Sequence, residues 1–440
     1  MLPLGQAGRG APRLSFGLTI WQKDPKAMPH VIPSHQSRPS DDPIFALNKE
    51  ATLRRERGEA IVNGTVGALL DDEGKLAVLP SAARAVHDVP AVEWATYAPI
   101  AGSPAFLKAV LDDLLATEPP LRAAAIATAT PGGSGALRHA IANFLEPGQS
   151  MLTASYYWGP YQTLCDEADR KVKTFRMFAP QEGAPAGALD VASLDRALSA
   201  QLAEQGRVLL FLNDPCNNPT GYSMRPSEWR AVVERLVARS SEGPVTLLVD
   251  MAYFAYGANE PRAFLKELVP LLGKVGLLFA WSASKTFTHY GLRVGALVAC
   301  FADEKERSLT ENAFSYSSRG TWSNCTRGGQ VAITRLLTEA SLADACDRER
   351  EGLKSLLRAR VDAFNALAPS KKLVYPRYEG GFFVTVFHDD PVGKGAAMRE
   401  KGVFVVPQKA PAGDQGRGAL RVALCSVAER DVARLVDALA

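Results

Sequence analysis

A lysine and an arginine stand close together in SASKTFTHYGLRVG, residues 282–295. Lys285 follows Ser284, and Arg293 comes eight residues later. Lysine forms Schiff bases with carbonyl compounds, whereas arginine binds phosphate through paired hydrogen bonds. A lone lysine at a strand end usually just reaches solvent. With Ser282 and Ser284 beside it, however, this pair suits a ligand that carries both an aldehyde and a phosphate.

A glycine-rich motif offers a second phosphate contact. Gly133 and Ser134 belong to TPGGSG, residues 130–135, at the expected start of a helix. Exposed backbone N–H groups and the positive end of a helix suit an anion. An ordinary strand-to-helix turn explains this motif equally well when it is taken alone. The phosphate fingerprints of nucleoside triphosphatases and of dinucleotide-binding folds are missing.

Three polar side chains and one aromatic residue follow other apolar runs. Asp250 ends VTLLVD, where it can pair with a cationic ring nitrogen or simply cap a turn. Tyr253 and the amide of Asn218, in NDPCNNPTG, can donate to a ring oxygen. Trp158, in YYWGPY, can stack on a ring or fill the core. Together with the amine of Lys285, these groups describe a site for pyridoxal 5′-phosphate.

The elements that must position these residues alternate between strands and helices. Continuous apolar runs separated by amphipathic segments predict an α/β fold with a mainly parallel sheet covered on both faces. In such sheets ligands bind beyond the carboxyl ends of the strands, which is where the motifs above fall. The last run leaves little room for a preceding helix and can break the parallel pattern. The expected strands are residues 123–129, 150–155, 171–178, 207–212, 244–249, 275–281 and 293–301.

Two flanking regions complete the organisation. Residues 41–58 predict a first helix with an aspartate cap, Pro43 in the opening turn and a glycine stop. After about residue 340, a long charged helix through Arg360 precedes short apolar runs, which indicates a smaller α+β unit. We therefore expect an N-terminal extension, a small domain made of two segments, and a large cofactor-binding domain. These are residues 1–40, residues 41–75 with 353–440, and residues 76–352.

Composition excludes several classes of protein. Of the 440 residues, 47% are hydrophobic and 22% charged, and the net charge of +3 is scattered, which argues against nucleic acid as a partner. No apolar stretch reaches the roughly 20 residues of a membrane span, and no histidine or cysteine spacing indicates a metal. Six separate cysteines fit a reducing cytoplasm. We interpret residues 1–40 as a disordered tail, with a weak transit-like segment or a true start at Met28 as alternatives.

Three motifs carry a resemblance to a known family. NNPTG, DMAYFAYG and SASKTFTHYGLRVG resemble those of the class I, fold-type-I aminotransferases, especially the aspartate and aromatic branch. The resemblance runs from about residue 41 to the C-terminus. It implies a three-layer α/β/α large domain with a small α+β domain, pyridoxal 5′-phosphate as cofactor, and a homodimer with shared active sites. The implied reaction is transamination between an L-amino acid, acidic or aromatic, and a 2-oxo acid such as 2-oxoglutarate.

The resemblance also implies roles for individual residues. The implied catalytic residues are Lys285, Asp250 and Tyr253. Lys285 forms the Schiff base and acts as general base, Asp250 binds the pyridine nitrogen, and Tyr253 binds the phenolic oxygen. The implied cofactor contacts further include Gly133, Ser134, Trp158, Asn218, Ser282, Ser284, Arg293 and, from the neighbouring subunit, Tyr97. The implied substrate contacts are Gly67, Trp158, Asn218, Arg421 on the α-carboxylate and Arg319 on a distal carboxylate, from across the dimer.

Four positions depart from the family pattern. Gly132 replaces a phosphate-binding serine, Leu69 and Tyr161 replace polar or aromatic residues, and Trp322 replaces a tyrosine. These changes leave the cofactor prediction intact and weaken the case for strict aspartate specificity.

Three other functions stay open at this point. The first is another reaction of the same cofactor, such as β-elimination or decarboxylation. The second is a non-catalytic effector domain of a regulator, for which residues 1–40 are too few to hold a DNA-binding module. The third is a generic nucleotide-binding α/β enzyme, which the missing phosphate fingerprints disfavour.

Overall fold

The computed structural model describes residues 29–39, 43–180, 187–412 and 416–440. Residues Pro43–Ala440 form one compact unit, and residues 29–39 belong to a separate one whose regular structure is a 3₁₀ turn, Pro33–His35. Our predictions for residues 1–28 and for the aspartate cap of the first helix lie outside the described residues. None of the helices within the described ranges is both long and apolar enough to cross a membrane.

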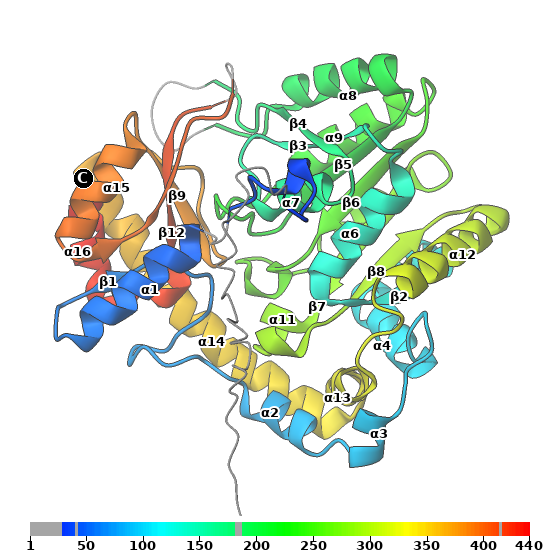
Figure 1. Ribbon diagram of the computed structural model, residues 1–440, viewed down its shortest axis with the longest axis horizontal. Helices are drawn as coiled ribbons and strands as arrows, with labels where there is room; N and C mark the ends of the chain where they lie inside the picture. Colours follow the sequence, from blue (N-terminus) through cyan, green and yellow to red (C-terminus); the bar gives the residue numbers. More distant parts are fainter. Residues whose placement is uncertain (1–28, 40–42, 181–186, 413–415) are drawn as a thin grey trace, which may run out of the picture. The chain divides into compact units, whose positions relative to one another are not determined.

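A seven-stranded sheet of order β2-β8-β7-β6-β5-β3-β4 forms the centre of the larger unit (Figure 1). All neighbouring strands are parallel except the pairs β2–β8 and β8–β7. The prediction that the seventh apolar run breaks the parallel pattern is therefore confirmed. The strands are β2 (Ala125–Pro131), β3 (Ser150–Ala154), β4 (Lys171–Phe175), β5 (Val208–Asn213), β6 (Val245–Asp250), β7 (Gly276–Ser282) and β8 (Val294–Cys300).

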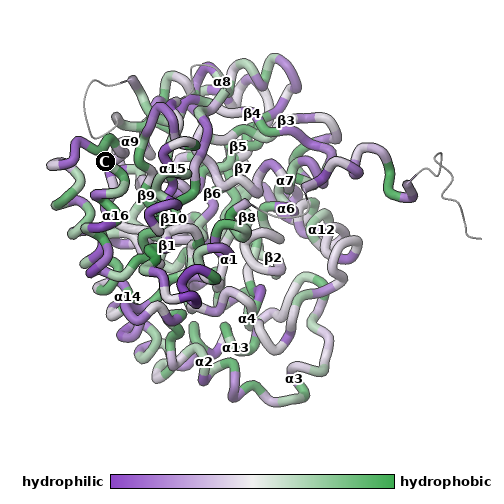
Figure 2. The backbone as a smooth tube through the Cα atoms, turned by 60° about the vertical axis from the view of Figure 1, so that its left-hand side comes forward, coloured by the Kyte–Doolittle hydropathy of each residue, from purple (hydrophilic) through white to green (hydrophobic). Residues whose placement is uncertain are grey.

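Helices cover both faces of this sheet because its strands are apolar on both sides. In β5, Leu210 and Leu212 pack into one apolar cluster, whereas Leu209 and Phe211 pack into another. Successive side chains of a strand point to opposite faces, so a strand that is apolar throughout must be covered twice. Figure 2 shows hydrophobic residues along central strands such as β5 and β7. The helices are α2 (Pro80–His87), α3 (Ala91–Ala95), α4 (Pro104–Leu115), α5 (Pro119–Ala123), α6 (Gly132–Phe144), α7 (Pro160–Asp166), α8 (Val191–Gln205), α9 (Pro226–Arg239), α10 (Leu265–Leu268), α11 (Ala283–Thr286), α12 (Glu304–Thr321) and α13 (Arg327–Thr338).

A smaller α+β part combines the beginning and the end of this unit. Strands β11, β12 and β9 form an antiparallel sheet, and β1 pairs in parallel with β10. Helix α14 contacts α2 and α13 of the large part as well as α16, so it joins the two parts (Figure 1). The elements are α1 (Pro43–Glu56), β1 (Val62–Asn63), α14 (Ala340–Leu367), β9 (Phe383–Phe387), α15 (Pro391–Glu400), β10 (Val403–Phe404), β11 (Val406–Gln408), β12 (Ala419–Ala423) and α16 (Val432–Leu439).

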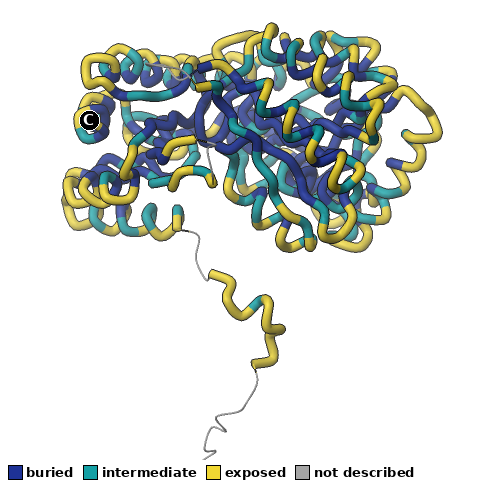
Figure 3. Tube along the Cα trace, turned by 90° about the horizontal axis from the view of Figure 1, so that it is seen from above, coloured by how far each residue is buried: buried dark blue, intermediate teal, exposed yellow. Residues whose placement is uncertain are grey.

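The predicted first helix, the long charged helix and the fold class are confirmed. Gly58, with a φ of +88°, follows the first helix, and the long helix runs past Arg360 to Leu367. Buried residues fill the interior of both parts (Figure 3). The domain boundaries at residues 75 and 353 stay a prediction.

Candidate active site

A cavity of about 220 Å³ lies where strands β5, β6 and β7 end. Since the carboxyl ends of parallel strands share one edge of a sheet, motifs far apart in the sequence meet here. Most of the predicted site residues line the cavity: Gly133, Ser134, Trp158, Asn218, Asp250, Tyr253, Ser282, Ser284, Lys285 and Arg293. Three residues that the sequence analysis did not select line it too: Leu137, Asn213 and Ala252.

One end of the cavity is built for an anion. Helix α6 begins at Gly132, and the N–H groups of a first helical turn have no partners within the helix. Nη1 of Arg293 donates to Ser284 Oγ at 3.2 Å and to the carbonyl oxygen of Tyr290 at 2.9 Å. A guanidinium and a helix N-terminus facing one cavity together suit a phosphate group.

The glycine at position 132 is required by this arrangement. Its φ is +69°, and a Cβ added there would lie 2.4 Å from Nη2 of Arg293. A serine, as the resembling family carries, would therefore displace the guanidinium. We conclude that Gly132 lets Arg293 approach the start of α6 directly.

A buried carboxylate lies deeper in the cavity, at the end of β6. Asp250 is 5% exposed, and its Oδ2 accepts a hydrogen bond from Tyr161 Oη at 2.6 Å, while Oδ1 accepts one from the N–H of Ala252 at 3.1 Å. Burial raises the pKa of Asp250, and the hydrogen bonds and Lys285 oppose this shift. Among the described residues, no lysine, arginine or histidine forms an ion pair with it. A buried carboxylate of this kind suits a cationic ligand group such as a protonated ring nitrogen.

The amine of Lys285 lies just beyond the end of β7, on α11. Its Nζ is 5.3 Å from the ring centroid of Tyr253 and 6.0 Å from that of Tyr290. Burial lowers the pKa of Lys285; Arg293 lowers it further, while Asp250 opposes the shift. A lowered pKa increases the neutral fraction of the amine, which is the form that attacks a carbonyl carbon or accepts a proton.

Two hydrogen-bond donors line the cavity together with the amine and the carboxylate. Nδ2 of Asn218 lies 3.5 Å from Oη of Tyr253, and both side chains are buried. Burial raises the pKa of Tyr253, so its phenol stays protonated at neutral pH and available as a donor. The pair suits an oxygen substituent on a bound ring. Amine, carboxylate, donor pair and anion site thus fit the groups of pyridoxal 5′-phosphate.

The polar side chains of the loop after β5, residues 213–221, hold the loop in place by bonds within it and to the segment that follows. Asn213 Oδ1 accepts from the N–H of Asn218 at 2.6 Å, and Asn217 Oδ1 accepts from the hydroxyl of Thr220 at 2.8 Å. Asp214 accepts from the N–H of Met224 at 2.8 Å and from the indole of Trp229 at 3.0 Å. The amide of Asn218 is therefore presented to the cavity by a loop that its own side chains fix.

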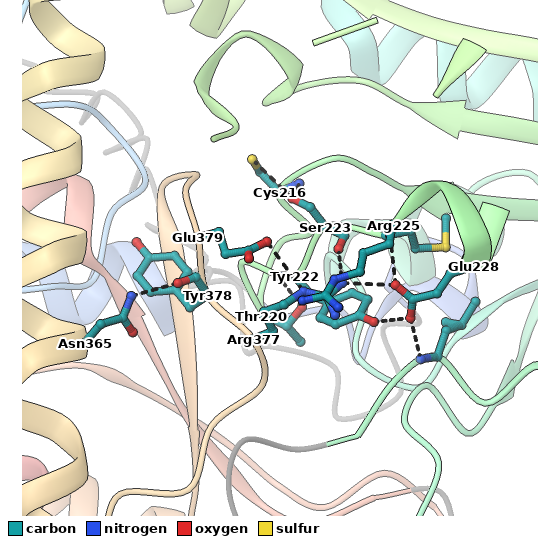
Figure 4. Close-up of polar contacts among 12 residues, drawn as sticks. Cys216, Thr220, Tyr222, Ser223, Arg225, Glu228, Asn365, Arg377, Tyr378 and Glu379 are labelled. Carbon is teal, nitrogen blue, oxygen red and sulfur yellow. Dashed lines mark hydrogen bonds and ion pairs between the residues drawn. The ribbon is translucent and has the colours of Figure 1, made fainter. Parts of the chain in front are cut away.

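Two residues from the smaller part of the fold hold this loop and the residues that follow it. The guanidinium of Arg377 lies 4.5 Å from the ring centroid of Tyr222 and donates to the carbonyl oxygen of Ser223 at 2.7 Å and to Glu228 Oε2 at 3.0 Å (Figure 4). Thr385, in β9, donates to the carbonyl oxygen of Pro219 at 2.9 Å. The loop that carries Asn218 is thus bound to both parts of the fold.

Two predicted substrate residues lie beside the cavity without lining it. Arg421 is buried in β12, with its guanidinium 4.9 Å from the ring centroid of Phe383. A Cβ on Gly67 would lie 2.2 Å from the same ring. Phe383 in turn packs against Tyr253, with ring centroids 5.5 Å apart. Gly67 and Arg421 are therefore neighbours of the cavity through one phenylalanine.

The remaining two predicted residues are not brought to the cavity within one chain. Tyr97, just after α3, is 84% exposed. Arg319, in the last turn of α12, is also exposed and donates to Ser323 Oγ at 2.5 Å. Both were expected to act from a neighbouring subunit.

Sequence reasoning missed two contributors to the site. Asn213 binds both the backbone of Asn218 and the carbonyl oxygen of Asp250, at 2.8 Å. A polar residue at the end of an apolar strand was the available signal. Tyr290 faces Lys285 and accepts from the N–H of Leu69 at 3.1 Å, which no pattern in the sequence indicated. In the ranges that the structure covers, no three His, Cys, Asp or Glu side chains gather so that they could hold a metal ion.

Comparisons with known proteins agree with this geometry. The family model for aminotransferases of class I and II matches residues 59–439. The aromatic-amino-acid aminotransferase of Pseudomonas aeruginosa is 31% identical over 253 residues, and the match spans 55% of this chain and 59% of that protein. The aspartate aminotransferase of the same organism is 27% identical over 356 residues, 78% of this chain and 85% of that protein.

A solved structure extends the match over nearly the whole chain. An aminotransferase from Anaerococcus prevotii superposes with a TM-score of 0.85 at 30% identity, covering 94% of this chain and 98% of that one. Sequence and three-dimensional similarity therefore indicate the same family.

Proposed function

Because the chain belongs to the class I and II aminotransferases, it is an enzyme that uses pyridoxal 5′-phosphate, and we propose that Lys285 is the residue that binds this cofactor covalently and transfers the proton. The observation that carries the proposal is the cavity at the end of β5, β6 and β7. It brings a lysine of lowered pKa, a buried carboxylate and an anion site together. We further propose that the reaction is transamination of an L-amino acid with a 2-oxo acid such as 2-oxoglutarate.

The chemistry divides between the cofactor and the chain. When bound, the cofactor supplies a reactive aldehyde and a ring that spreads negative charge from the substrate Cα. Nζ of Lys285 accepts the Cα proton as general base and later returns a proton. Asp250 holds the ring nitrogen protonated, and Tyr253 with Asn218 donates to the ring oxygen. Trp158 packs on the ring face.

Two further groups of residues fix the positions of the cofactor phosphate and of the substrate. Arg293 and the start of α6, with Gly133 and Ser134, hold the phosphate. Arg421, whose Nη2 donates to the carbonyl oxygen of Thr65 at 2.5 Å, binds the substrate α-carboxylate and so orients the Cα–H bond toward Lys285. Gly67, Ser282 and Ser284 complete the proposed contacts.

We propose a homodimer with shared sites in the cytoplasm. Large apolar side chains remain exposed on the two segments that carry Tyr97 and Arg319: Val92, Trp94 and Tyr97 on and after α3, and Leu309 and Tyr316 on α12. A second copy that covers them would bring Tyr97 and Arg319 to its neighbour's cavity. The six cysteines are unpaired, buried thiols, as suits a reducing compartment.

The amino donor is proposed from the relatives. Their names include both aromatic and aspartate aminotransferases, and we assign Arg319 to the distal carboxylate of an acidic substrate. We therefore propose that the donors are acidic and aromatic L-amino acids.

The visible spectrum of the purified enzyme tests this function. Addition of aspartate, glutamate, tyrosine or phenylalanine should convert the aldehyde form of the cofactor to its amine form, and 2-oxoglutarate should restore it. Borohydride reduction should attach the cofactor to Lys285 in peptide maps. Release of ammonia or carbon dioxide without recovery by 2-oxoglutarate would establish elimination or decarboxylation instead. Labelling of another amine would overturn the assignment of Lys285.

A further inference from the structure

Tyr161 contacts the buried carboxylate from outside the cofactor cavity. It lies on α7, is fully buried, and donates its phenol O–H to Oδ2 of Asp250 at 2.6 Å. Asp250 lines the cavity, whereas Tyr161 lines a smaller space beside Phe211. A ligand in the cavity therefore meets Asp250 and not Tyr161.

The ring of Tyr161 is held in place by other aromatic residues. It packs edge-on against Phe211, with centroids 5.4 Å apart, and against Trp158 at 5.8 Å, and it lies parallel to Tyr157 at 6.2 Å. A buried phenol with its ring fixed on three sides aims its O–H in one direction. That direction is the carboxylate.

The bond is of the strong, charge-assisted kind. An O–H to carboxylate distance of 2.6 Å is typical of an ionised acceptor. Burial raises the pKa of Tyr161 far above its ordinary value, so the phenol donates throughout the physiological pH range. Because a phenol is neutral, it supports the negative charge of Asp250 without neutralising it. The other titratable groups that face Asp250 are Tyr253 and Lys285.

We propose that Tyr161 is a positioning residue that keeps Asp250 ionised and correctly turned, so that the carboxylate can hold the ring nitrogen of the cofactor protonated. This inference rests on the proposed function, and it assigns Tyr161 a task that acts only through Asp250. Without the phenol, the N–H of Ala252 is the one hydrogen-bond donor that the described part of the chain leaves to the carboxylate. Asp250 would then take the shared proton from the ring nitrogen more readily.

The variant Tyr161→Phe removes the hydroxyl and keeps the ring. We expect cofactor binding and melting temperature close to wild type, a fall in kcat of about 10–100-fold, and little change in KM. With ¹⁵N-labelled cofactor, the ring-nitrogen resonance should move from the protonated toward the unprotonated position, and this movement should begin at lower pH than in wild type. Tyr157→Phe, in the same aromatic cluster, should leave both properties unchanged.

The outcomes separate the two proposals. If wild-type enzyme takes up no cofactor, the proposed function fails. If wild type turns over normally and Tyr161→Phe matches it in kcat and in the nitrogen resonance, only the role of Tyr161 is overturned. Should Tyr161→Phe fail to fold, 3-fluorotyrosine at position 161, a stronger donor of nearly the same size, decides the matter. It should extend ring-nitrogen protonation to higher pH, and an unchanged titration would overturn the inference.

Discussion

Predicted site residues lie in two different settings, some in the buried cavity and others on the exposed segments at α3 and α12. In the cavity, Asp250 at the end of β6 and Ser284 just beyond the end of β7 are fixed by hydrogen bonds. On the surface, Tyr97 is 84% exposed, and Arg319 donates to Ser323 just after the end of its helix. Most of the groups proposed to bind the cofactor thus lie together within one chain. Tyr97, proposed as a cofactor contact, and Arg319, proposed to select the substrate, are expected to act on the cavity of a second chain.

The strongest test of the cavity is removal of its amine. Lys285→Ala should lower kcat by about a thousandfold or more, because both the covalent step and general base catalysis are lost. The exposed lysine Lys274, changed to alanine, serves as control. Turnover of aspartate or phenylalanine, measured with 2-oxoglutarate, is the readout. Near wild-type turnover in Lys285→Ala would remove the basis of the proposed chemistry.

A buried histidine lies at the contact between helix α6, which begins at the cavity, and helix α12, which carries Arg319. His139 of α6 stacks on Trp322 at 4.3 Å and lies 2.9 Å from the hydroxyl of Ser318 in α12. Burial lowers its pKa from 6.5 to about 4. Between pH 6.5 and about 4, this histidine is protonated in the unfolded chain but neutral in the folded one. The free energy of unfolding therefore decreases as the pH falls through this window. The full effect corresponds to roughly 3 kcal/mol in the free energy of unfolding.

Comparison with His139→Gln isolates this effect. Asp214, whose pKa burial raises to about 7, contributes a slope of opposite sign that both proteins share. Urea unfolding of the holoenzyme from pH 7.5 to 4 should show the stability advantage of wild type shrinking as the pH falls. Parallel stability curves for the two proteins would contradict the assignment.

The anion end of the cavity is tested by Arg293→Gln. Loss of the charged donor should weaken binding of pyridoxal 5′-phosphate about 10–100-fold, since hydrogen bonds to charged groups contribute about 1.5–3 kcal/mol. Affinity for pyridoxal, which has no phosphate, should hardly change, as measured by equilibrium dialysis. Arg196→Gln, on the exposed side of α8, is the matched control. An equal loss of affinity for pyridoxal 5′-phosphate and for pyridoxal would show that Arg293 does not bind the phosphate.

The smallest expected effect concerns the surface. Arg319→Ala should lower kcat/KM for aspartate by about tenfold relative to phenylalanine, while Lys305→Ala on the same helix should change neither. Co-expression of Lys285→Ala with Arg319→Ala should restore about half of the wild-type activity toward aspartate in the mixed dimer, since one site then keeps both native residues. Failure of this complementation would show that Arg319 does not act across a dimer.

Sequence patterns predicted the cavity because its residues follow strands that end at one edge. They could not predict contacts between side chains from separate segments. The bond from Tyr161 to Asp250 and the close approach of Gly132 to Arg293 depend on how α7 and α6 dock on the sheet. Likewise, Arg360 in the charged helix α14 is fully buried and donates to backbone oxygens of other segments.

The polar loop after β5 illustrates the same limit. Its composition suggested that it holds a ligand, and Asn218 does face the cavity. Other polar groups of the loop instead bind protein groups: Asn217 bonds within the loop, and Asp214 bonds to Met224 and Trp229 in the segment that follows. Composition indicated that hydrogen bonds would form but not with which partner.

The reversed direction of β8 has a consequence for how this enzyme can vary. Val294 at the start of β8 pairs with Pro131 at the end of β2, and Gly295 pairs with Ser282 at the end of β7. Had β8 run parallel to its neighbours, its first residue would lie about 20 Å away, at the opposite rim. One inverted strand thus lets a single short connection deliver both an amine and a guanidinium to the same rim. A different path for that connection, which also contributes Phe287 to the core, would separate the two charges.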